Sequence, residues 1–378
     1  MHVINGLGPA GTERMLVKLL ESSTGPWEHV VVSLMEADTP LAARLSELGI
    51  PVHSLRLNRS IPNPLSALAI ISLARRLRPH LIEGWLYYSN LLTNLAAVSL
   101  PGRVPIFWNI RSSLYDIKTE RFRTAAGIRI GAALSRRVDA IIYNSQTGAQ
   151  HHQAIGMRGK AVFIPNGFDC QVFRPDAGAR QQVRAELGIT DDQVLIGLIA
   201  RFHPNKDHAT FFKAAASVVQ AHSNVRFVLL GADGTSEDPG LQKLVADHRL
   251  QPYVMLLRER IDMASFTNAL DISSSSSWTE GCSNVIGEAM ACGVPCVVTD
   301  VGENTYLVSD TGISVPSRNP EAFAEGLLRL IDAGASGRRQ LGRAARRRIE
   351  EQFSMPTVAR AYERLYEEHL ASPKLVPA

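Results

Sequence analysis

The feature that most limits how this chain can fold is a regular alternation of short apolar segments with longer segments of helical period. In the first half, apolar segments that fit β-strands lie at 2–5, 29–33, 52–55, 81–84, 106–109, 140–144 and 162–164. Helical spacing of apolar residues covers 12–22, 41–48, 64–77 and 121–136. Strands that alternate with helices form parallel βαβ units, so we predict an α/β fold with a doubly wound parallel sheet.

The second half of the chain repeats this alternation. Strands are expected at 194–200, 225–230, 254–257, 272–274, 295–299 and 313–315. Helices are expected at 209–221, 241–248, 263–270, 284–292, 321–333, 337–353 and 356–372. A chain of 378 residues is long for a single core, so we expect two domains.

The domain boundary is predicted in the sequence IPNGFDCQVFRPD, where proline, asparagine and glycine interrupt the alternation. We place one Rossmann-like domain at 1–168 and a second at 169–355, and we expect the helix at 356–372 to pack back on the first. Two such domains that face each other leave a central cleft at the carboxyl ends of their strands, where ligands bind in folds of this kind.

Composition excludes several classes of protein. Hydrophobic residues make up 45% of the chain and charged residues 20%, as in folded globular proteins. The net charge of +4 suits an anionic small ligand or a membrane surface, but no basic run is interleaved with aromatic residues, so nucleic-acid binding is not expected. No apolar run reaches the roughly 18 residues of a membrane span, and no secretion signal is recognisable. We therefore expect a cytoplasmic protein.

Metal binding is not expected either. The cysteines are Cys170, Cys282, Cys292 and Cys296, and only the last two stand close together, without a second pair to complete a zinc site. They are best interpreted as small buried residues in a reducing compartment. No D-x-D follows a strand, so we predict neither a metal nor a cofactor.

One carboxylate is unusual within ISSSSSWTEGCSNVIGEAMACGVPCVVTDV, residues 272–301. Glu288 lies in a predicted helix between the segments VIG and AMA. A carboxylate that is buried without a hydrogen-bond partner costs several kcal/mol, and the hydroxyl groups of a ligand would supply such partners. A glutamate on the solvent side of the helix, or one held by a nearby arginine, is equally compatible with this segment alone.

Two further segments have residue types that suit phosphate groups. Gly6, Gly8 and Gly11 form G-x-G-x-x-G between a strand and a helix, where backbone amides and the helix N-terminus attract anions. A tight turn without a ligand fits equally well. Arg201 and Lys206 follow the first strand of the second domain, and their charges suit a mono- or diphosphate. Solvated loop cations are the alternative.

The segment EGCSN completes this set of candidates. Gly281 permits an unusual backbone turn, and Ser283 or Asn284 can cap the helix that follows. The amides of that helix start would hold an anion, and Glu280 and Glu288 would line the same pocket at different depths. Two carboxylates, two cations and a helix N-terminus describe a site for a sugar attached to a diphosphate.

In these residues the chain resembles the retaining glycosyltransferases of family 4, which have the GT-B fold. Glu280 and Glu288 match the E-x7-E pattern of that family in EGCSNVIGEAMACGVPCVVTDVG, and RFHPNKDHATFFKAA is similar to its arginine–lysine phosphate stretch. GLGPAGTERML resembles its N-terminal glycine-rich loop, and IIYNSQ and IPNGFD resemble two of its inter-element markers. The resemblance extends from Gly6 to Leu370.

The resemblance implies a nucleotide-sugar-binding second domain and an acceptor-side first domain. Glu288 would bind the ribose hydroxyls of the donor, and Glu280 would orient the donor sugar. Arg201 and Lys206 would stabilise the leaving diphosphate, so Arg201, Lys206 and Glu280 are the predicted catalytic residues. The other predicted donor-binding residues are Gly8, Gly11, Arg260, Gly281, Cys282, Ser283, Asn284 and Glu288. Charge neutralisation by these groups makes a divalent metal unnecessary.

The acceptor side departs from the family pattern. Where family members have a histidine, IFWNIRSS contains Arg111, and Asn109 or Arg111 would contact the donor sugar instead. Trp85 and Tyr87 would line the acceptor face, although a tryptophan beside a strand end is more often part of a core. The helix at 121–136 is rich in arginine, and such helices in this family can contact anionic membrane; a solvated basic face is the alternative.

The sequence therefore predicts a retaining hexosyltransferase of GT-B fold. Its donor would be a nucleotide-diphosphate sugar, a UDP-sugar first of all, and its acceptor a hydroxyl of a saccharide or a lipid-linked molecule. The resemblance implies a role in polysaccharide or glycolipid biosynthesis, in the cytoplasm or peripherally at the inner face of the cell membrane. The alternatives are a hydrolysing sugar-nucleotide epimerase, a catalytically silent nucleotide-sugar-binding subunit and, from the N-terminal glycines alone, an NAD-dependent oxidoreductase.

Overall fold

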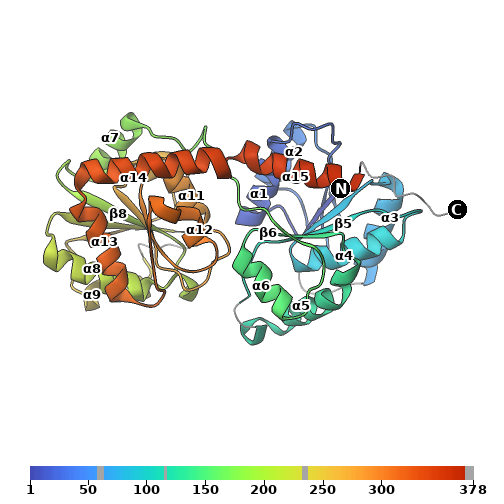
Figure 1. Ribbon diagram of the computed structural model, residues 1–378, viewed down its shortest axis with the longest axis horizontal. Coiled ribbons are helices and arrows are strands. Elements are labelled where there is room, and N and C mark those ends of the chain that lie inside the picture. Colours follow the sequence, from blue (N-terminus) through green and yellow to red (C-terminus); the bar gives the residue numbers. More distant parts are fainter. Residues whose placement is uncertain (58–63, 115–116, 232–236, 371–378) are drawn as a thin grey trace. The chain divides into compact units, whose positions relative to one another are not determined.

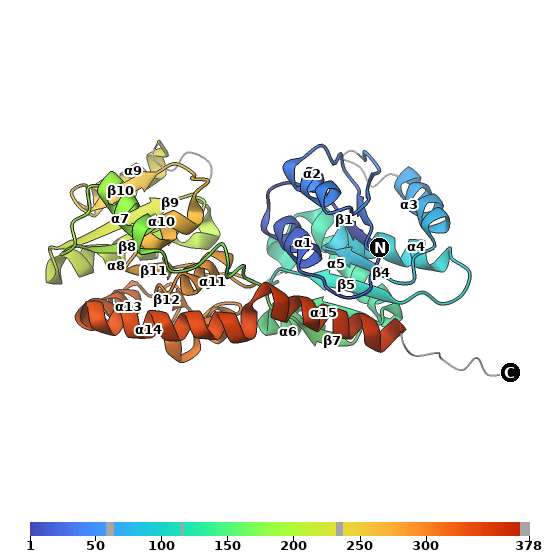
Figure 2. The ribbon, with the colours of Figure 1, turned by 90° about the horizontal axis from the view of Figure 1, so that it is seen from above.

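The computed structural model describes residues 1–57, 64–114, 117–231 and 237–370. The chain divides into two units (Figures 1 and 2). The first unit contains Met1–Gly167 and the chain from Met355 onwards, and the second contains Phe168–Ser354. Among the described residues, the first unit has a seven-stranded sheet and the second a six-stranded sheet, and the strand pairs in both are parallel.

The sheet of the first unit has the strand order β3-β2-β1-β4-β5-β6-β7. Its strands are β1 His2–Ile4, β2 Val31–Ser33, β3 Val52–Ser54, β4 Ile82–Trp85, β5 Ile106–Ile110, β6 Ala140–Tyr143 and β7 Ala161–Phe163. Its helices are α1 Gly11–Glu21, α2 Pro40–Glu47, α3 Pro64–Leu77, α4 Tyr87–Val98, α5 Phe122–Leu134, α6 Gln146–Ala154 and α15 Met355–Leu370, with 3-10 turns at Ile117–Thr119 and Ser135–Arg137. The order of strands reverses between β1 and β4, which defines a doubly wound sheet.

The sheet of the second unit has the order β10-β9-β8-β11-β12-β13 and reverses between β8 and β11. Its strands are β8 Val194–Ile199, β9 Val225–Leu230, β10 Val254–Leu257, β11 Ile272–Ser275, β12 Cys296–Thr299 and β13 Ile313–Val315. Its helices are α7 Ala177–Glu186, α8 His208–Ala221, α9 Pro239–Asp247, α10 Met263–Ala269, α11 Asn284–Ala291, α12 Asn304–Val308, α13 Pro320–Asp332 and α14 Gly334–Arg348, with short turns at Pro204–Lys206, Ser309–Thr311 and Ile349–Phe353.

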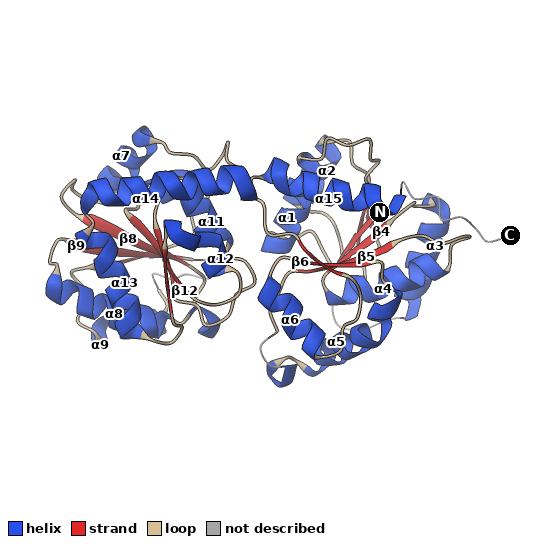
Figure 3. Cartoon of the chain, in the orientation of Figure 1, coloured by secondary structure: helices blue, strands red, loops and turns tan. Residues whose placement is uncertain are grey.

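Helices cover both faces of each sheet (Figure 3), so the central strands are buried on both sides. All residues of β4, β5 and β12 are buried, so apolar residues dominate β5 and β12 without a strict alternation. The polar residues of β4 and β5, Glu83 and Asn109, hydrogen-bond to each other. Several helices begin with a capping side chain followed by proline, a strong start signal. These pairs are Thr39 and Pro40, Asp238 and Pro239, and Asn319 and Pro320.

The C-terminal helix α15 packs within the first unit, against α1. Its apolar face shares a core with residues of β5 and β6 such as Phe107 and Ile142, to which Met355, Val358 and Tyr362 contribute. Residues 371 and 372, which we expected at the end of this helix, lie outside the described residues.

The predicted α/β architecture of two Rossmann-like parallel sheets is confirmed. Each predicted strand occurs, with its ends shifted by at most two residues. The helices α4, α6, α7 and α12 were not predicted. In α4 the buried face includes polar residues (Ser89, Asn90, Thr93 and Asn94), so an apolar helical period could not reveal it.

Candidate active site

The predicted donor-site residues of the second unit gather at one edge of its sheet. Arg201 follows β8, and Lys206 ends the short 3-10 turn after it. The segment 276–283 follows β11 and leads to the start of α11. Because β8 and β11 are adjacent and parallel, their carboxyl ends meet at the same edge, next to the point where the strand order reverses.

Lys206 and Glu280 form an ion pair at this edge. Lys206 Nζ lies 2.5 Å from Glu280 Oε1, and the two side chains are 25% and 14% exposed. The hydroxyl of Ser277 donates to the same carboxylate oxygen at 2.7 Å. The lysine charge is thus held in a half-buried position by a carboxylate, so a phosphate that approaches Lys206 competes with Glu280 for the same ammonium group.

The start of α11 lacks a capping hydrogen bond from the side chain of its N-cap residue. Ser283 occupies the N-cap position, with φ −73° and ψ 113°, but its side chain makes no capping hydrogen bond. Of the two residues that could cap this helix, Ser283 and Asn284, Ser283 does not do so through its side chain. A helix start without a side-chain cap can offer its first amides to a negatively charged group. Cys282 is buried, Gly281 is half-buried and Asn284 is exposed.

Glu288 lies one turn into α11, between buried Gly287 and buried Ala289, and is itself half-buried. Gly287 packs against the ring of Phe168 so closely that an added Cβ would lie 2.0 Å from it. The apolar side of α11 is therefore occupied by packing, and Glu288 stands at its border. This position agrees with either of the interpretations left open by the sequence, and its ribose contact stays a prediction.

The turn after β12 packs against the backbone of Glu280 and Gly281. Gly302 has φ +57°, and an added Cβ would lie 2.4 Å from the carbonyl oxygens of Glu280 and Gly281. The amide of buried Glu303 donates to the carbonyl of Gly281 at 2.8 Å. Sequence reasoning did not single out Gly302 or Glu303, and the signal for them was a glycine three residues after a predicted strand.

The two predicted arginines of the donor site have different surroundings. Arg201 is exposed, and among the described residues no ion pair involves it. Arg260 is bound to Glu186 at 2.6 Å and to Asp262 at 2.8 Å, and these hydrogen bonds raise the pKa of its guanidinium. A nucleobase would have to use the remaining surface of Arg260, so its donor contact stays a prediction.

The N-terminal glycines lie at the turn between β1 and α1. Gly11 is the first residue of α1, whose N-cap Ala10 supplies no side-chain hydrogen bond. A Cβ at Gly8 would meet no atom within 4 Å. Packing within the first unit therefore does not require glycine at position 8, and its predicted contact with the donor remains untested.

The predicted acceptor-side residues belong to a buried network of the first unit. Trp85 is fully buried and stacks on Tyr362 of α15, with ring centroids 6.3 Å apart. Asn109, also fully buried, donates to Glu83 and to the Tyr362 hydroxyl, each at 2.8 Å. Arg111 is half-buried and donates to Asn109 Oδ1 at 3.0 Å and to Tyr362 at 3.2 Å.

These contacts fix α15 on the sheet, so Trp85, Asn109 and Arg111 have a structural role whatever else they do. Tyr87 is half-buried, and its hydroxyl is bonded to His152 Nε2 at 2.8 Å and to Ser112 at 3.1 Å. Burial raises the pKa of Tyr87 to about 12. A role of these four residues in acceptor binding stays a prediction.

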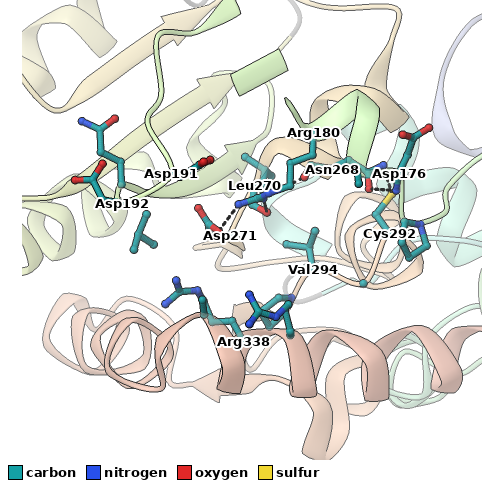
Figure 4. Close-up of a pocket in the computed structure, with 18 residues that line it drawn as sticks. Asp176, Arg180, Asp191, Asp192, Asn268, Leu270, Asp271, Cys292, Val294 and Arg338 are labelled. Carbon is teal, nitrogen blue, oxygen red and sulfur yellow. Dashed lines mark hydrogen bonds and ion pairs between the residues drawn. The ribbon is translucent and has the colours of Figure 1, made fainter. Parts of the chain in front are cut away.

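A separate pocket of about 500 Å³ lies at the opposite edge of the second sheet, before β8, β11 and β12 (Figure 4). Its charges are largely paired within the protein: Asp271 binds Arg180 at 2.7 Å and Arg184 at 2.9 Å. Arg338 donates to the carbonyls of Leu330 and Ile331 at the end of α13. These contacts join α7 to the residue before β11 and α14 to the end of α13, and they are best explained by packing.

Within the described residues there is no cluster of three or more histidine, cysteine, aspartate or glutamate side chains that could hold a metal ion. In the same part of the chain, no helix combines the length and the apolar character that crossing a membrane requires.

Both units match known glycosyltransferase domains. Residues 11–167 match a family model described as a glycosyl transferase 4-like domain, and residues 193–333 match one described as glycosyl transferases group 1. The solved structure of HepE from Anabaena in complex with UDP is similar to this chain with a TM-score of 0.84, at 19% sequence identity and over 97% of this chain and 99% of that one. Together these findings support a glycosyltransferase of the GT-B fold.

More specific relatives are similar over part of their length. EpsF of Bacillus subtilis is 30% identical over 187 residues, 47% of this chain and 46% of EpsF. A D-inositol 3-phosphate glycosyltransferase of Kineococcus radiotolerans is 30% identical over 232 residues, 55% of this chain and 53% of that protein. The chain thus spans about half of the length of the curated relatives that it matches.

Proposed function

We propose that this protein is a retaining glycosyltransferase that moves a sugar from a UDP-sugar to a hydroxyl group of an acceptor. The observation that carries the proposal is the Lys206–Glu280 pair beside the start of α11, at the carboxyl edge of β8 and β11. HepE, which shares the fold, has been solved with UDP and with UDP-glucose, and this supports the choice of donor.

The chemistry follows from the charges at this edge. When the bond between the sugar and the diphosphate breaks, negative charge develops on the leaving oxygen. Lys206, Arg201 and the α11 amides stabilise that charge, so they lower the barrier more than they stabilise the bound donor. Glu280 orients the hydroxyls of the sugar, and Glu288 binds the ribose. No metal ion is needed in this scheme.

Retention of configuration follows from attack on the same face that the diphosphate leaves. In the proposed step the acceptor hydroxyl forms the new C–O bond while the bond to the diphosphate breaks, and the acceptor proton passes to a phosphate oxygen. The electron pair of the broken bond stays on the diphosphate. The acceptor is a saccharide or a lipid-linked molecule, as expected for polysaccharide or glycolipid assembly in the cytoplasm or at the inner face of the membrane.

The test measures UDP release from a panel of UDP-sugars, with and without saccharide acceptors. Lys206→Ala should lower kcat by about 100-fold because it removes a charge that acts on the leaving group, and Glu288→Gln should mainly raise KM. Lys243→Ala is the matched control, since Lys243 is exposed and pairs with Asp247 on α9. Full activity of both site variants would refute the assignment.

The same assay separates the rival enzyme classes. A hydrolysing epimerase consumes UDP-sugar at the same rate without any acceptor, whereas a transferase depends on one. A silent binding subunit binds UDP without turnover on any acceptor. Analysis of the anomeric configuration of the product by NMR tests retention, and an inverted product would contradict the proposed same-face attack.

A further inference from the structure

The serine-rich segment after β11 contacts both residues of the Lys206–Glu280 pair. Ser276 is fully buried, and its hydroxyl donates to the carbonyl of Lys206 at 2.8 Å. The backbone amide of Trp278 donates to the carbonyl of Asn205 at 3.0 Å, and its indole N–H donates to the carbonyl of Pro204 at 3.0 Å. Three consecutive carbonyls of the turn at 204–206 are thus held by Ser276 and Trp278.

Ser277 lies between Ser276 and Trp278, and its side chain contacts Glu280 instead of the turn at 204–206. Its hydroxyl donates to Glu280 Oε1, the oxygen that also binds Lys206 Nζ. Ser276 and Trp278 thus contact the turn at 204–206, which we call the lysine turn, and Ser277 between them contacts Glu280. The segment therefore sets the position of both members of the ion pair.

The segment is itself fixed from two other elements. Thr299, at the end of β12, donates through its hydroxyl to the carbonyl of Ser277 at 2.5 Å. Arg318, after β13, lies with its guanidinium 4.6 Å from the centroid of the Trp278 ring, a cation–π contact. The lysine turn is fixed at its far end by Asp207, which caps α8 through Thr210.

We propose that Ser276 and Trp278 are positioning residues for Lys206, which they hold through the backbone of residues 204–206. The inference rests on the proposed function, because the group that Lys206 must reach is the leaving diphosphate of the donor. A lysine on a loose loop would lose much of its effect, since a misplacement of about 1 Å can cost up to about 100-fold in rate.

The variants Ser276→Ala and Trp278→Phe each remove one of these hydrogen bonds. Ser274→Ala is the matched control: Ser274 is buried in β11, directly before this segment, and its hydroxyl donates to the carbonyl of Gly197 at 2.8 Å, away from the turn at 204–206. All three lose one hydroxyl or N–H donor to a backbone carbonyl, so a merely structural effect should be similar in each.

We expect Ser276→Ala and Trp278→Phe to lower kcat for UDP release by about tenfold with KM within about twofold, and Ser274→Ala to change neither. In a Lys206→Ala background the two variants should have no further effect on kcat, because residues that act through one group are not additive. Equal effects of all three variants, or full additivity with Lys206→Ala, would overturn the proposal.

Amide hydrogen exchange of His203 and of residues 205–207 tests the positioning without any turnover. Ser276→Ala should speed exchange of these amides, whereas Ser274→Ala should not. If the wild-type protein neither binds UDP nor releases it from any UDP-sugar, the proposed function fails, and the exchange result still decides the positioning. Unchanged exchange in Ser276→Ala would refute it.

Discussion

At the scale of single residues, the Lys206–Glu280 pair shows how a site can hold its charges before a ligand arrives. The pair lies within a half-buried edge, where both groups need partners. Ser277 binds the carboxylate from one side, so Glu280 remains in place when a phosphate takes over the lysine. The pair is therefore both a structural contact and a competitor of the ligand.

This competition predicts an unusual result for Glu280→Gln. The variant removes a negative charge from a site for a diphosphate and releases Lys206 from its ion pair, so UDP should bind about fivefold more tightly, a gain of about 1 kcal/mol. Turnover of the UDP-sugar should fall, because the sugar loses the carboxylate that orients it. Calorimetry with UDP and the release assay measure the two effects. Weaker UDP binding in the variant would contradict the competition.

Gly302 offers a second test at this scale. Alanine at this position has to adopt φ +57° and also meets the carbonyl oxygens of Glu280 and Gly281, so the loss of stability should be about 2–4 kcal/mol. Gly188→Ala is the control: Gly188 has φ +66° but no atom within 4 Å of an added Cβ, and we expect a loss of about 1 kcal/mol from the backbone alone.

The two glycine variants also separate stability from function. Chemical denaturation gives the stability of each, and calorimetry gives the affinity for UDP. Only Gly302→Ala should weaken UDP binding, because only it displaces the backbone of Glu280 and Gly281 next to the start of α11. Equal affinity in the two variants would show that the turn after β12 does not support the site.

At the scale of elements, the helix α5 has an exposed face that combines charge with apolar surface. Phe122 is 86% exposed and Ile130 54% exposed, and the exposed arginines beside them are Arg121, Arg123, Arg129, Arg136 and Arg137. Exposed apolar side chains among arginines suit the surface of an anionic membrane. This placement agrees with the peripheral membrane contact that we expect from the sequence.

The test for α5 is sedimentation with vesicles that contain an anionic lipid. Replacement of Arg121, Arg129 and Phe122 by glutamine should weaken vesicle binding by at least about tenfold, at about 1 kcal/mol per basic residue. The matched control replaces Arg339, Arg343 and Arg347, which are exposed on α14, by glutamine. If both triple variants bind vesicles equally, α5 has no special role in membrane contact.

The elements also show what the sequence could and could not predict. Strands such as β8 and β12 were recognisable because strands buried on both faces consist largely of apolar residues. The helix α4 was not predicted because its buried face contains Ser89, Asn90 and Thr93. Trp108 donates its indole N–H to the Thr93 hydroxyl at 3.1 Å, so these polar residues have partners that only the tertiary structure supplies.

The candidate site, too, was predictable from the sequence only in part. Lys206 and Glu280 could be proposed from residue type and resemblance, but their ion pair joins residues 74 positions apart and depends on the adjacency of β8 and β11. The serine run was visible only as a compositional bias. Its contacts with the lysine turn could not be inferred, because the side to which each serine points is set by the end of β11.

At the scale of the whole molecule, each unit contains a buried histidine that the fold keeps neutral. His152 Nδ1 lies 2.6 Å from the carbonyl of Gly148, which can only accept, so Nε2 accepts from the Tyr87 hydroxyl. Burial lowers the pKa of His152 to about 4. In the second unit, burial, assisted by nearby Lys206, lowers the pKa of His208 to about 4.

These two histidines predict acid sensitivity in a defined window. The unfolded chain takes up protons near pH 6.5, whereas the folded protein resists them until about pH 4. Unfolding is therefore favoured as the pH falls from 6.5 towards 4, by about 1.4 kcal/mol per pH unit for each histidine. Thermal melting between pH 7 and 4.5 measures this. His152→Asn should flatten the profile, and exposed His80→Asn should not; identical profiles would contradict the account.

The central claim is that the second unit binds the diphosphate of a nucleotide sugar through Lys206. The most direct test compares UDP with uridine by calorimetry, since uridine lacks the diphosphate and should use only the contacts near Glu288. We predict that Lys206→Ala weakens UDP binding by about 10- to 100-fold, as expected for loss of a charge-assisted hydrogen bond, and leaves uridine binding unchanged. An unchanged affinity for UDP, or an equal loss for uridine, would contradict the claim.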